Sequence, residues 1–396
     1  MVEFDPYSYA THDNPYPVYR RLRDEAPLYF NEQRGFWVVS RYDDCRAALR
    51  NFSAFSNASG TTLEDTPALQ DVLSSDPPDH TRLRHVMSPL FQPTKIARLE
   101  DMVRAATRSL LACHAEIGRI DIIDDFACRL PMLVISRMLG HPPEDDEMLL
   151  NWTNTTIHRD EGVQALPAAG LEALTSINNY NDAVLRRRAD GPPRDDLVGA
   201  LIAAIREGRL SHVEAMGYMQ ILSFAGHETT TKLIGNMIYQ LFRHPEQRQW
   251  LLDDPSLIAA AVEETVRFDT SVQLQARTML SDFEMHGRTI PAGARVAILF
   301  GSANRDDRKY ADAETYDIRR NARDHIGFGY GLHSCLGAPL ARLEARIAIE
   351  ELLALMPDYV VDEAGARRVH SANVRGYSHL PVNFAPSTAL GEITGG

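Results

Sequence analysis

The stretch FGYGLHSCLGAPLAR, residues 328–342, decides the fold of this chain. Three glycines surround Cys335, and the residues that follow have the apolar spacing of an amphipathic helix. A glycine-rich loop that leads into a helix N-terminus places free backbone N–H groups around the sulfur. Those donors and the helix dipole favour a thiolate. We therefore interpret Cys335 as a functional cysteine rather than an ordinary buried one.

Composition excludes several classes of protein. The chain has 396 residues, of which 44% are hydrophobic and 24% charged, so it can bury a sizeable core. A net charge of −13 disfavours binding to nucleic acid, which needs clustered Lys and Arg. No apolar run approaches the ~18 residues of a membrane span, and no signal peptide is visible. The four cysteines are widely spaced. We expect a soluble, cytoplasmic protein without disulfides or a zinc site.

The periodicity of apolar residues predicts a mainly α protein with small peripheral β-sheets. No G-x-G-x-x-G or P-loop pattern is present, so no nucleotide site is predicted. A turn at 286–293 is expected to lead into a strand at 295–300. Helices are predicted at 95–117, 127–139, 171–188, 196–207 and 212–243, and the other strands at 35–40, 277–285 and 380–384.

The cysteine loop resembles the haem-binding loop of the cytochrome P-450 superfamily. The pattern F-x-x-G-x-[RH]-x-C-x-G is matched by Phe328, Gly331, His333, Cys335 and Gly337. The resemblance implies haem b with the Cys335 thiolate as its axial iron ligand, and thiolate donation favours O–O cleavage. It implies that His333 reaches a haem propionate and that Phe328 packs beside the sulfur. It also implies a triangular helical domain with haem between a long central helix and the helix after the loop.

A second segment, AGHETT at 225–230, lies within the long predicted helix. Gly226 lowers helix stability by about 1 kcal/mol relative to Ala, and threonine hydroxyls can bond back to the preceding turn. The segment resembles the family's oxygen-activation motif, which implies a local bulge over the ligand. Glu228 would then relay protons, and Thr229 would assist oxygen activation by hydrogen bonding. A solvent-facing polar turn is the alternative interpretation.

A third segment, EETVR at 263–267, places Glu264 and Arg267 on one helix face. Taken alone, such a pair is usually a solvated surface pair. It resembles the family's E-x-x-R motif, in which a later arginine completes a buried network that supports the haem loop. Arg320 fits that position best. The resemblance implies a structural role for all three residues.

Propionate-binding residues are expected from a fourth segment, DPPDHTRLR at 76–84. His80 and Arg84 are four residues apart on a predicted helix and share a face. Buried carboxylates need cationic partners, and the resemblance implies that these side chains bind the haem propionates. Arg277 is a further candidate. An exposed basic helix face is the alternative for the helical pair.

The four segments occur in the family's order, and the resemblance covers about residues 12–385. It implies a haem-thiolate monooxygenase that uses O2 and comprises one domain, residues 1–396, without a fused reductase. Electrons would come from a ferredoxin or flavodoxin with an NAD(P)H-dependent reductase. Arg82, Arg342 and Arg346 are candidates for a basic surface that binds this donor. We expect a monomer.

The substrate is expected to be a mostly apolar small molecule with some polar groups, such as a polyketide, terpenoid or aromatic natural product. The reaction would be hydroxylation or oxidative dealkylation. Arg375 could meet a substrate carboxylate, but we expect it at the surface. The residues expected to line the substrate pocket are Leu222, Ala225, Val272, Gln273, Leu274, Asn373 and Val374.

Other functions remain open at this point. Oxidative phenol coupling would use the same haem without inserting oxygen, and product mass would distinguish it from hydroxylation. A haem-thiolate sensor without turnover would not need the Glu228–Thr229 pair. A peroxide-driven enzyme typically carries a different pair at these two positions. A helical scaffold without haem would be colourless.

Overall fold

The computed structural model describes residues 2–64, 71–156 and 160–386. α-Helices form most of it, and the largest apolar core lies among them. The helices are α1 (Tyr9–Asp13), α2 (Tyr16–Glu25), α3 (Tyr42–Arg50), α4 (Asp79–Met87), α5 (Pro93–Ile96), α6 (Glu100–Ala115), α7 (Arg129–Leu139), α8 (Asp146–Thr155), α9 (Ala168–Ala189), α10 (Leu197–Arg206), α11 (His212–Ala225), α12 (Glu228–Arg243), α13 (Pro245–Asp253), α14 (Ile258–Phe268), α15 (Phe300–Ala303) and α16 (Ala338–Leu355).

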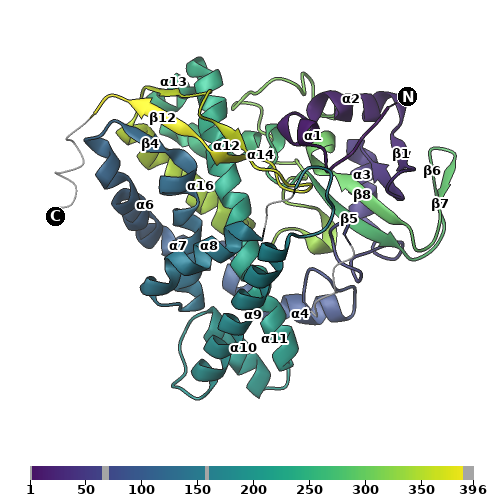
Figure 1. The fold of residues 1–396 in the computed structure, drawn as a ribbon, viewed down its shortest axis with the longest axis horizontal. Helices are drawn as coiled ribbons and strands as arrows, with labels where there is room; N and C mark the ends of the chain where they lie inside the picture. Colours follow the sequence, from purple (N-terminus) through teal and green to yellow (C-terminus); the bar gives the residue numbers. More distant parts are fainter. Residues whose placement is uncertain (1, 65–70, 157–159, 387–396) are drawn as a thin grey trace.

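The β-strands form small sheets beside the helices (Figure 1). The largest has the strand order β1-β2-β8-β5-β3, and a second has the order β4-β12-β9. Strands β6 and β7 form a hairpin whose turn is His286–Gly287, both with positive φ, within the predicted turn region. The strands are β1 (Leu28–Asn31), β2 (Phe36–Val39), β3 (Phe55–Ser56), β4 (Arg119–Asp121), β5 (Leu274–Met279), β6 (Phe283–Met285), β7 (Arg288–Ile290), β8 (Arg295–Leu299), β9 (Tyr359–Val361), β10 (Arg367–Arg368), β11 (Tyr377–His379) and β12 (Pro381–Phe384).

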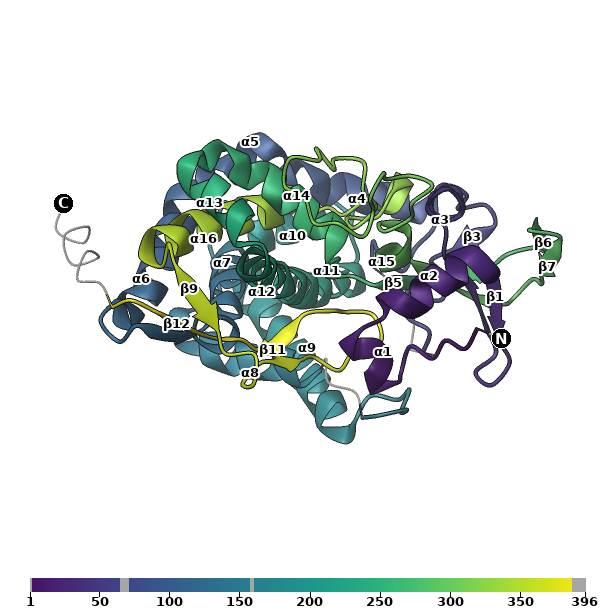
Figure 2. The ribbon, with the colours of Figure 1, turned by 90° about the horizontal axis from the view of Figure 1, so that it is seen from above.

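Helix α12 occupies the centre of the molecule (Figure 2). It packs against α16, α14 and the π-helical segment η3 (Ile122–Ala127). Its buried residues cover nearly every side of the helix, as expected of a helix enclosed by others. Because α16 follows the cysteine loop, this packing fixes that loop relative to the central helix.

The prediction of a mainly helical chain with small peripheral sheets is confirmed. The single helix expected over 212–243 is instead two helices, α11 and α12, separated at Gly226 and His227. Helix α11 begins with a capping box between Ser211 and Glu214. In the described residues, no helix is long and apolar enough to cross a membrane.

Candidate active site

The cysteine loop, residues 328–337, is held by backbone hydrogen bonds. Cys335 N donates to Phe328 O at 2.8 Å, which closes the loop on itself. Gly331 has a φ of +75°, and a methyl group there would lie 2.9 Å from the carbonyl oxygen of Leu49. Only glycine meets both demands, because the backbone is left-handed and α3 lies against it. The loop therefore reaches Cys335 in a fixed path.

Cys335 is accessible to solvent although many protein atoms surround its sulfur. These atoms raise the pKa of the thiol by desolvation. Hydrogen bonds from the backbone N–H groups of Gly337 and Ala338 act in the opposite direction. The expected donors are thus present, but in the protein alone they do not make the thiolate the favoured form. A metal ion bound to the sulfur would remove the proton outright.

Four basic side chains converge near this cysteine. The rings of His80 and His333 lie 4.2 Å apart between centroids. Burial, followed by the charges of His80, Arg277 and Arg84, lowers the pKa of His333 to about 3. Arg84 also interacts electrostatically with Cys335. The residues come from α4, β5 and the cysteine loop.

These basic side chains have few partners of their own. Among the described residues, neither ring nitrogen of His80 has a hydrogen-bond partner, and Nε2 of His333 has none, although all three atoms are buried. Arg277 is 2% exposed and donates Nη1 to the carbonyl oxygen of its neighbour Ala276. No acid forms an ion pair with Arg84 or Arg277 within the described ranges. Such a cluster fits a ligand that carries carboxylates and lies beside Cys335.

The central helix opens at the predicted oxygen-activation motif. Gly226 separates α11 from α12, and a methyl group there would lie 2.9 Å from both Ile135 Cγ1 and the Leu222 carbonyl oxygen. Thr229 Oγ1 donates to the Ala225 carbonyl oxygen at 3.4 Å, a long hydrogen bond. Ala225 is exposed, although its helix runs through the core. The backbone is therefore interrupted where the motif predicted a bulge.

Glu228 is buried next to this interruption. It is 6% exposed, and its Oε2 lies 3.2 Å from Nζ of Lys232. Its Oε1 lies 3.9 Å from Nδ1 of His227. Burial lowers the pKa of His227. The carboxylate is therefore enclosed by protein and not by bulk water, as a proton-transferring acid requires.

Glu264, Arg267 and Arg320 form a buried cluster. Arg267 donates Nε and Nη2 to the two carboxylate oxygens of Glu264, each at 2.7 Å. Both side chains are completely buried. Arg320 Nε lies 3.4 Å from Glu264 Oε1. The structure thus brings together the three residues expected to form a network, and it buries the pair that could also have been a solvated surface pair.

Several residues expected at the substrate pocket have other surroundings. Gln273 is 4% exposed and donates Nε2 to the Thr270 carbonyl oxygen at 2.5 Å. Leu274 is 1% exposed and belongs to the apolar core beside the largest sheet. Their assignment to the pocket stays a prediction.

Two of the three segments expected at the pocket meet, namely those of Val272 and Val374. Leu222 is buried, while Val272, Asn373 and Val374 are partly exposed. Val272 and Val374 form an isolated antiparallel bridge, and Gln273 N donates to the Asn373 carbonyl oxygen at 2.8 Å. These two segments are therefore adjacent.

Arg375 is not at the surface. It is 6% exposed, and its Nε donates to Asp269 Oδ1 at 3.0 Å. Its Nη1 donates to the carbonyl oxygens of His12 and Asp13. The surface position expected for Arg375 is wrong, because Asp269 provides a buried partner from a distant part of the sequence.

The three arginines expected to form a basic docking surface are all paired. Arg342 Nε lies 2.6 Å from Glu263, and Arg346 Nη2 lies 2.8 Å from Glu100. Arg82 pairs with Glu214. These pairs cancel much of the positive charge expected there. Sequence patterns do not reveal them, because the partners are distant in the chain.

Sequence reasoning also missed Lys232. It is one of only three lysines in the chain, and it lies four residues after Glu228 on the predicted helix. That spacing places the two side chains on one face and could have indicated the ion pair.

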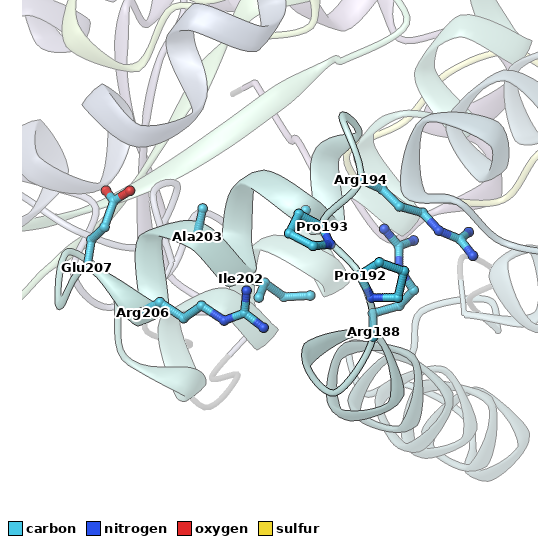
Figure 3. Close-up of a pocket in the computed structure, with 10 residues that line it drawn as sticks. Arg188, Pro192, Pro193, Arg194, Ile202, Ala203, Arg206 and Glu207 are labelled. Carbon is cyan, nitrogen blue, oxygen red and sulfur yellow. The ribbon is translucent and has the colours of Figure 1, made fainter.

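A separate cavity of about 230 Å³ lies between the end of α9 and α10 (Figure 3). Arg188, Arg194 and Arg206 line it, together with Pro192 and Pro193. Arg188 is already paired with Asp196 at 2.9 Å. None of the predicted site residues lines this cavity.

Comparison with known proteins gives matches over nearly the whole chain. A family model described as cytochrome P450 matches residues 172–355. A Mycobacterium tuberculosis protein named putative cytochrome P450 123 is 42% identical over 96% of both chains. Cytochrome P450 monooxygenase PikC of Streptomyces venezuelae is 36% identical over 96% of this chain and 94% of its own. The solved structure of Bacillus subtilis cytochrome P450 PksS, of the bacillaene polyketide synthase, superimposes with a TM-score of 0.88 at 34% identity, covering 97% of this chain and 100% of that one.

Proposed function

This chain belongs to the cytochrome P450 family of monooxygenases, and we propose that it holds haem b through the Cys335 thiolate and inserts one oxygen atom of O2 into a mostly apolar small molecule. The observation that carries the proposal is an accessible cysteine beside four basic side chains with few partners. When bound, the iron supplies the reductive activation of O2.

The residues present fit this cofactor. Haem b carries one iron and two propionate carboxylates. Cys335 offers a sulfur ligand, and the rings of His80 and His333 offer N–H donors. Arg84 and Arg277 offer both N–H donors and positive charge for the carboxylates. Unpaired buried cations are costly, so a bound anion would stabilise this part of the protein.

Glu228 and Thr229 are proposed to handle protons. Glu228 takes up a proton from water at a carboxylate oxygen and passes it towards the interruption between α11 and α12. The Thr229 hydroxyl, whose 3.4 Å bond to Ala225 is long, is available to donate a hydrogen bond there. General acid catalysis of this kind typically contributes about 10²- to 10⁴-fold.

The substrate is proposed to be a natural product with an apolar skeleton. Leu222, Ala225, Val272 and Val374 supply apolar surface, and Asn373 supplies a polar group. The relative PksS belongs to a polyketide synthase by its description, which supports a polyketide among the candidates. A spectral titration with steroids, terpenes, macrolactones and aromatic acids tests this, because a bound substrate displaces water from the iron and shifts the Soret band. If no compound of any of these classes shifts the band, the proposal of a free, mostly apolar small molecule is contradicted.

Electrons are proposed to come from a separate ferredoxin or flavodoxin with its NAD(P)H-dependent reductase. Because Arg342 and Arg346 are already paired with acids, the donor would meet a nearly neutral surface beside α16. We expect the rate of reduction to fall only weakly with ionic strength. A stopped-flow series in salt measures this.

The ligand assignment is tested by the carbon-monoxide spectrum of the reduced protein. Cys335→Ala is expected to abolish the thiolate-type Soret band, because no other sulfur replaces it. Cys113→Ala, which removes an exposed cysteine on α6, is the matched control and should keep the band. An unchanged spectrum in the Cys335 variant would falsify the assignment.

A further inference from the structure

A buried ion pair joins two residues of α12 that lie one turn apart. Lys232 Nζ is 3.2 Å from Glu228 Oε2, and the two side chains are 6% and 8% exposed. On a solvated helix such a pair contributes little. Here both charges are withdrawn from water, so removal of one would leave the other buried without its partner.

Gly376 provides the space for the Lys232 side chain. A methyl group at position 376 would lie 2.6 Å from Cβ of Lys232 and 2.8 Å from both Cγ and Cδ. These atoms form the base of the side chain and cannot turn away easily. Gly376 directly follows Asn373–Arg375, and Arg375 N donates to the Ser271 carbonyl oxygen at 2.7 Å. A segment expected to line the substrate pocket is therefore continuous with the residue that packs on Lys232.

Other titratable groups near Glu228 are neutral at neutral pH. Burial lowers the pKa of His227, whose Nδ1 is 3.9 Å from Glu228 Oε1. Burial raises the pKa of Cys128, at the end of η3, to about 12. Among the described residues, Lys232 is the one lysine or arginine whose nitrogen lies within 4 Å of the carboxylate.

We propose that Lys232 is a positioning residue for Glu228. The aliphatic stem of Lys232 packs on Gly376, and its ammonium group attracts the carboxylate from 3.2 Å. In this way Lys232 sets how efficiently Glu228 passes protons towards Thr229. The proposal rests on the proposed function. Without Lys232 the carboxylate would reorient, and O2 that has received two electrons and two protons would leave as hydrogen peroxide instead of oxidising substrate.

The ion pair itself is tested without turnover. Thermal unfolding of Lys232→Met, Glu228→Gln and the double variant forms a double-mutant cycle. We expect both single variants to lower the Tm, and the double variant to lower it by less than the two losses together. The double variant leaves no unpaired charge, so it should fold even if a single variant is too unstable to fold. Additive losses would overturn the proposal.

The positioning role is tested by coupling, measured as product formed per NAD(P)H consumed. The assay uses the holoenzyme with an added ferredoxin and reductase, and the compound of the titration panel that shifts the Soret band most. We expect Lys232→Met to lower this ratio about threefold to tenfold and to raise the solvent deuterium isotope effect about twofold. Arg243→Met removes an exposed cation from the other end of α12 and should change neither.

Two outcomes distinguish the proposals. A Lys232→Met protein with a normal thiolate-type carbon-monoxide spectrum, wild-type coupling and a wild-type isotope effect would show that Lys232 only stabilises the helix. Absence of that spectrum in the wild-type protein would contradict the proposed function instead.

Discussion

At the scale of single residues, Thr229 has a place that a purely structural threonine would not need. Its hydroxyl reaches the Ala225 carbonyl oxygen only at 3.4 Å, whereas Thr231 makes bonds of 3.0 and 3.1 Å to the carbonyl oxygens of Ala127 and His227. Thr231 is therefore committed to the packing of α12 on η3. Thr229 remains free to serve a ligand.

Replacing Thr229 by Ala should uncouple electron use from product formation. Without the hydroxyl, reduced oxygen is protonated in the wrong place, and we expect peroxide release per NAD(P)H to rise about tenfold. Peroxide and product are measured in the same assay. Thr229→Ser keeps the hydroxyl and should stay near the wild-type values. If product per electron were unaffected in the Ala variant, Thr229 would not be the oxygen-activating hydroxyl.

Glu344 on α16 is a second residue whose chemistry is unusual. It is completely buried, and neither carboxylate oxygen has a hydrogen-bond partner among the described residues. Burial raises its pKa well above the ordinary value of 4.5. The folded protein therefore keeps a proton that the unfolded chain releases. By linkage, rising pH above about 4.5 favours unfolding until the folded pKa is passed.

Glu344→Gln should remove this loss of stability, because an amide does not titrate. We expect the free energy of unfolding in urea to fall from pH 5 to pH 8 by less in the variant than in the wild type. Glu116→Gln, at an exposed position, is the control and should follow the wild type. Parallel curves for the wild type and the Glu344 variant would refute the proposed neutral carboxyl.

At the scale of elements, the sequence predicted which segments are helical better than it predicted where each helix ends or what it contacts. The periodicity over 212–243 predicted one helix, but periodicity does not detect the interruption at Gly226, which depends on the Ile135 side chain packed beside it. Gln273 and Leu274 were both assigned to the pocket from their place in the chain. In the fold, Gln273 bonds to the Thr270 carbonyl oxygen just before β5, and Leu274 belongs to the apolar core beside the largest sheet.

The short motifs were the part of the candidate site that the sequence predicted best. The cysteine loop and the E-x-x-R motif have fixed local spacings, and the structure closes both as local units. The partners of Arg375 and Arg342 could not be predicted, because Asp269 and Glu263 are 106 and 79 residues away. Only the folded chain brings such charges together.

The cluster around Glu264 yields a prediction about α14. Arg267 also donates Nη1 to the carbonyl oxygens of Asn304 and Ala313, each at 2.9 Å, so it joins the helix to the segment that precedes the cysteine loop. Arg267→Met leaves Glu264 buried and should lower the free energy of unfolding by about 3–5 kcal/mol. Urea unfolding measures this. The outer Arg320→Met variant should lose less, since Arg320 is 3.4 Å from Glu264. Equal losses of the free energy of unfolding in the two variants would contradict a larger contribution from Arg267 than from Arg320.

At the scale of the whole molecule, Asp269 connects parts that are distant in sequence. Its Oδ1 accepts from Tyr16 of α2 at 2.9 Å and from Arg375 at 3.0 Å. Its Oδ2 accepts from Gln240 of α12 at 3.0 Å. The N-terminal helices, the central helix and the segment before β11 thus share one buried carboxylate. Loss of its charge would loosen all three.

This connection predicts how the molecule responds to acid. Burial alone would raise the pKa of Asp269, but the guanidinium groups of Arg375, Arg368 and Arg305 lower it to about 2, from an ordinary value of 3.8. The ion pair therefore stabilises the fold fully above the unfolded pKa, and its contribution is lost as pH falls from about 3.8 towards 2. The shift corresponds to on the order of 2 kcal/mol.

Asp269→Asn should therefore destabilise the protein at pH 7 and leave a shallower fall in stability between pH 4 and pH 2. Unfolding in urea at a series of pH values measures both effects. Asp253→Asn, at an exposed site on α13, should keep the wild-type slope. The variant leaves Arg375 buried without its carboxylate. We therefore expect the variant to lose more free energy of unfolding at pH 7 than the wild type loses in acid, because protonated Asp269 can still donate a hydrogen bond. If Asp269→Asn leaves the fall in the free energy of unfolding between pH 4 and pH 2 unchanged, other carboxylates are responsible for the acid sensitivity of this fold.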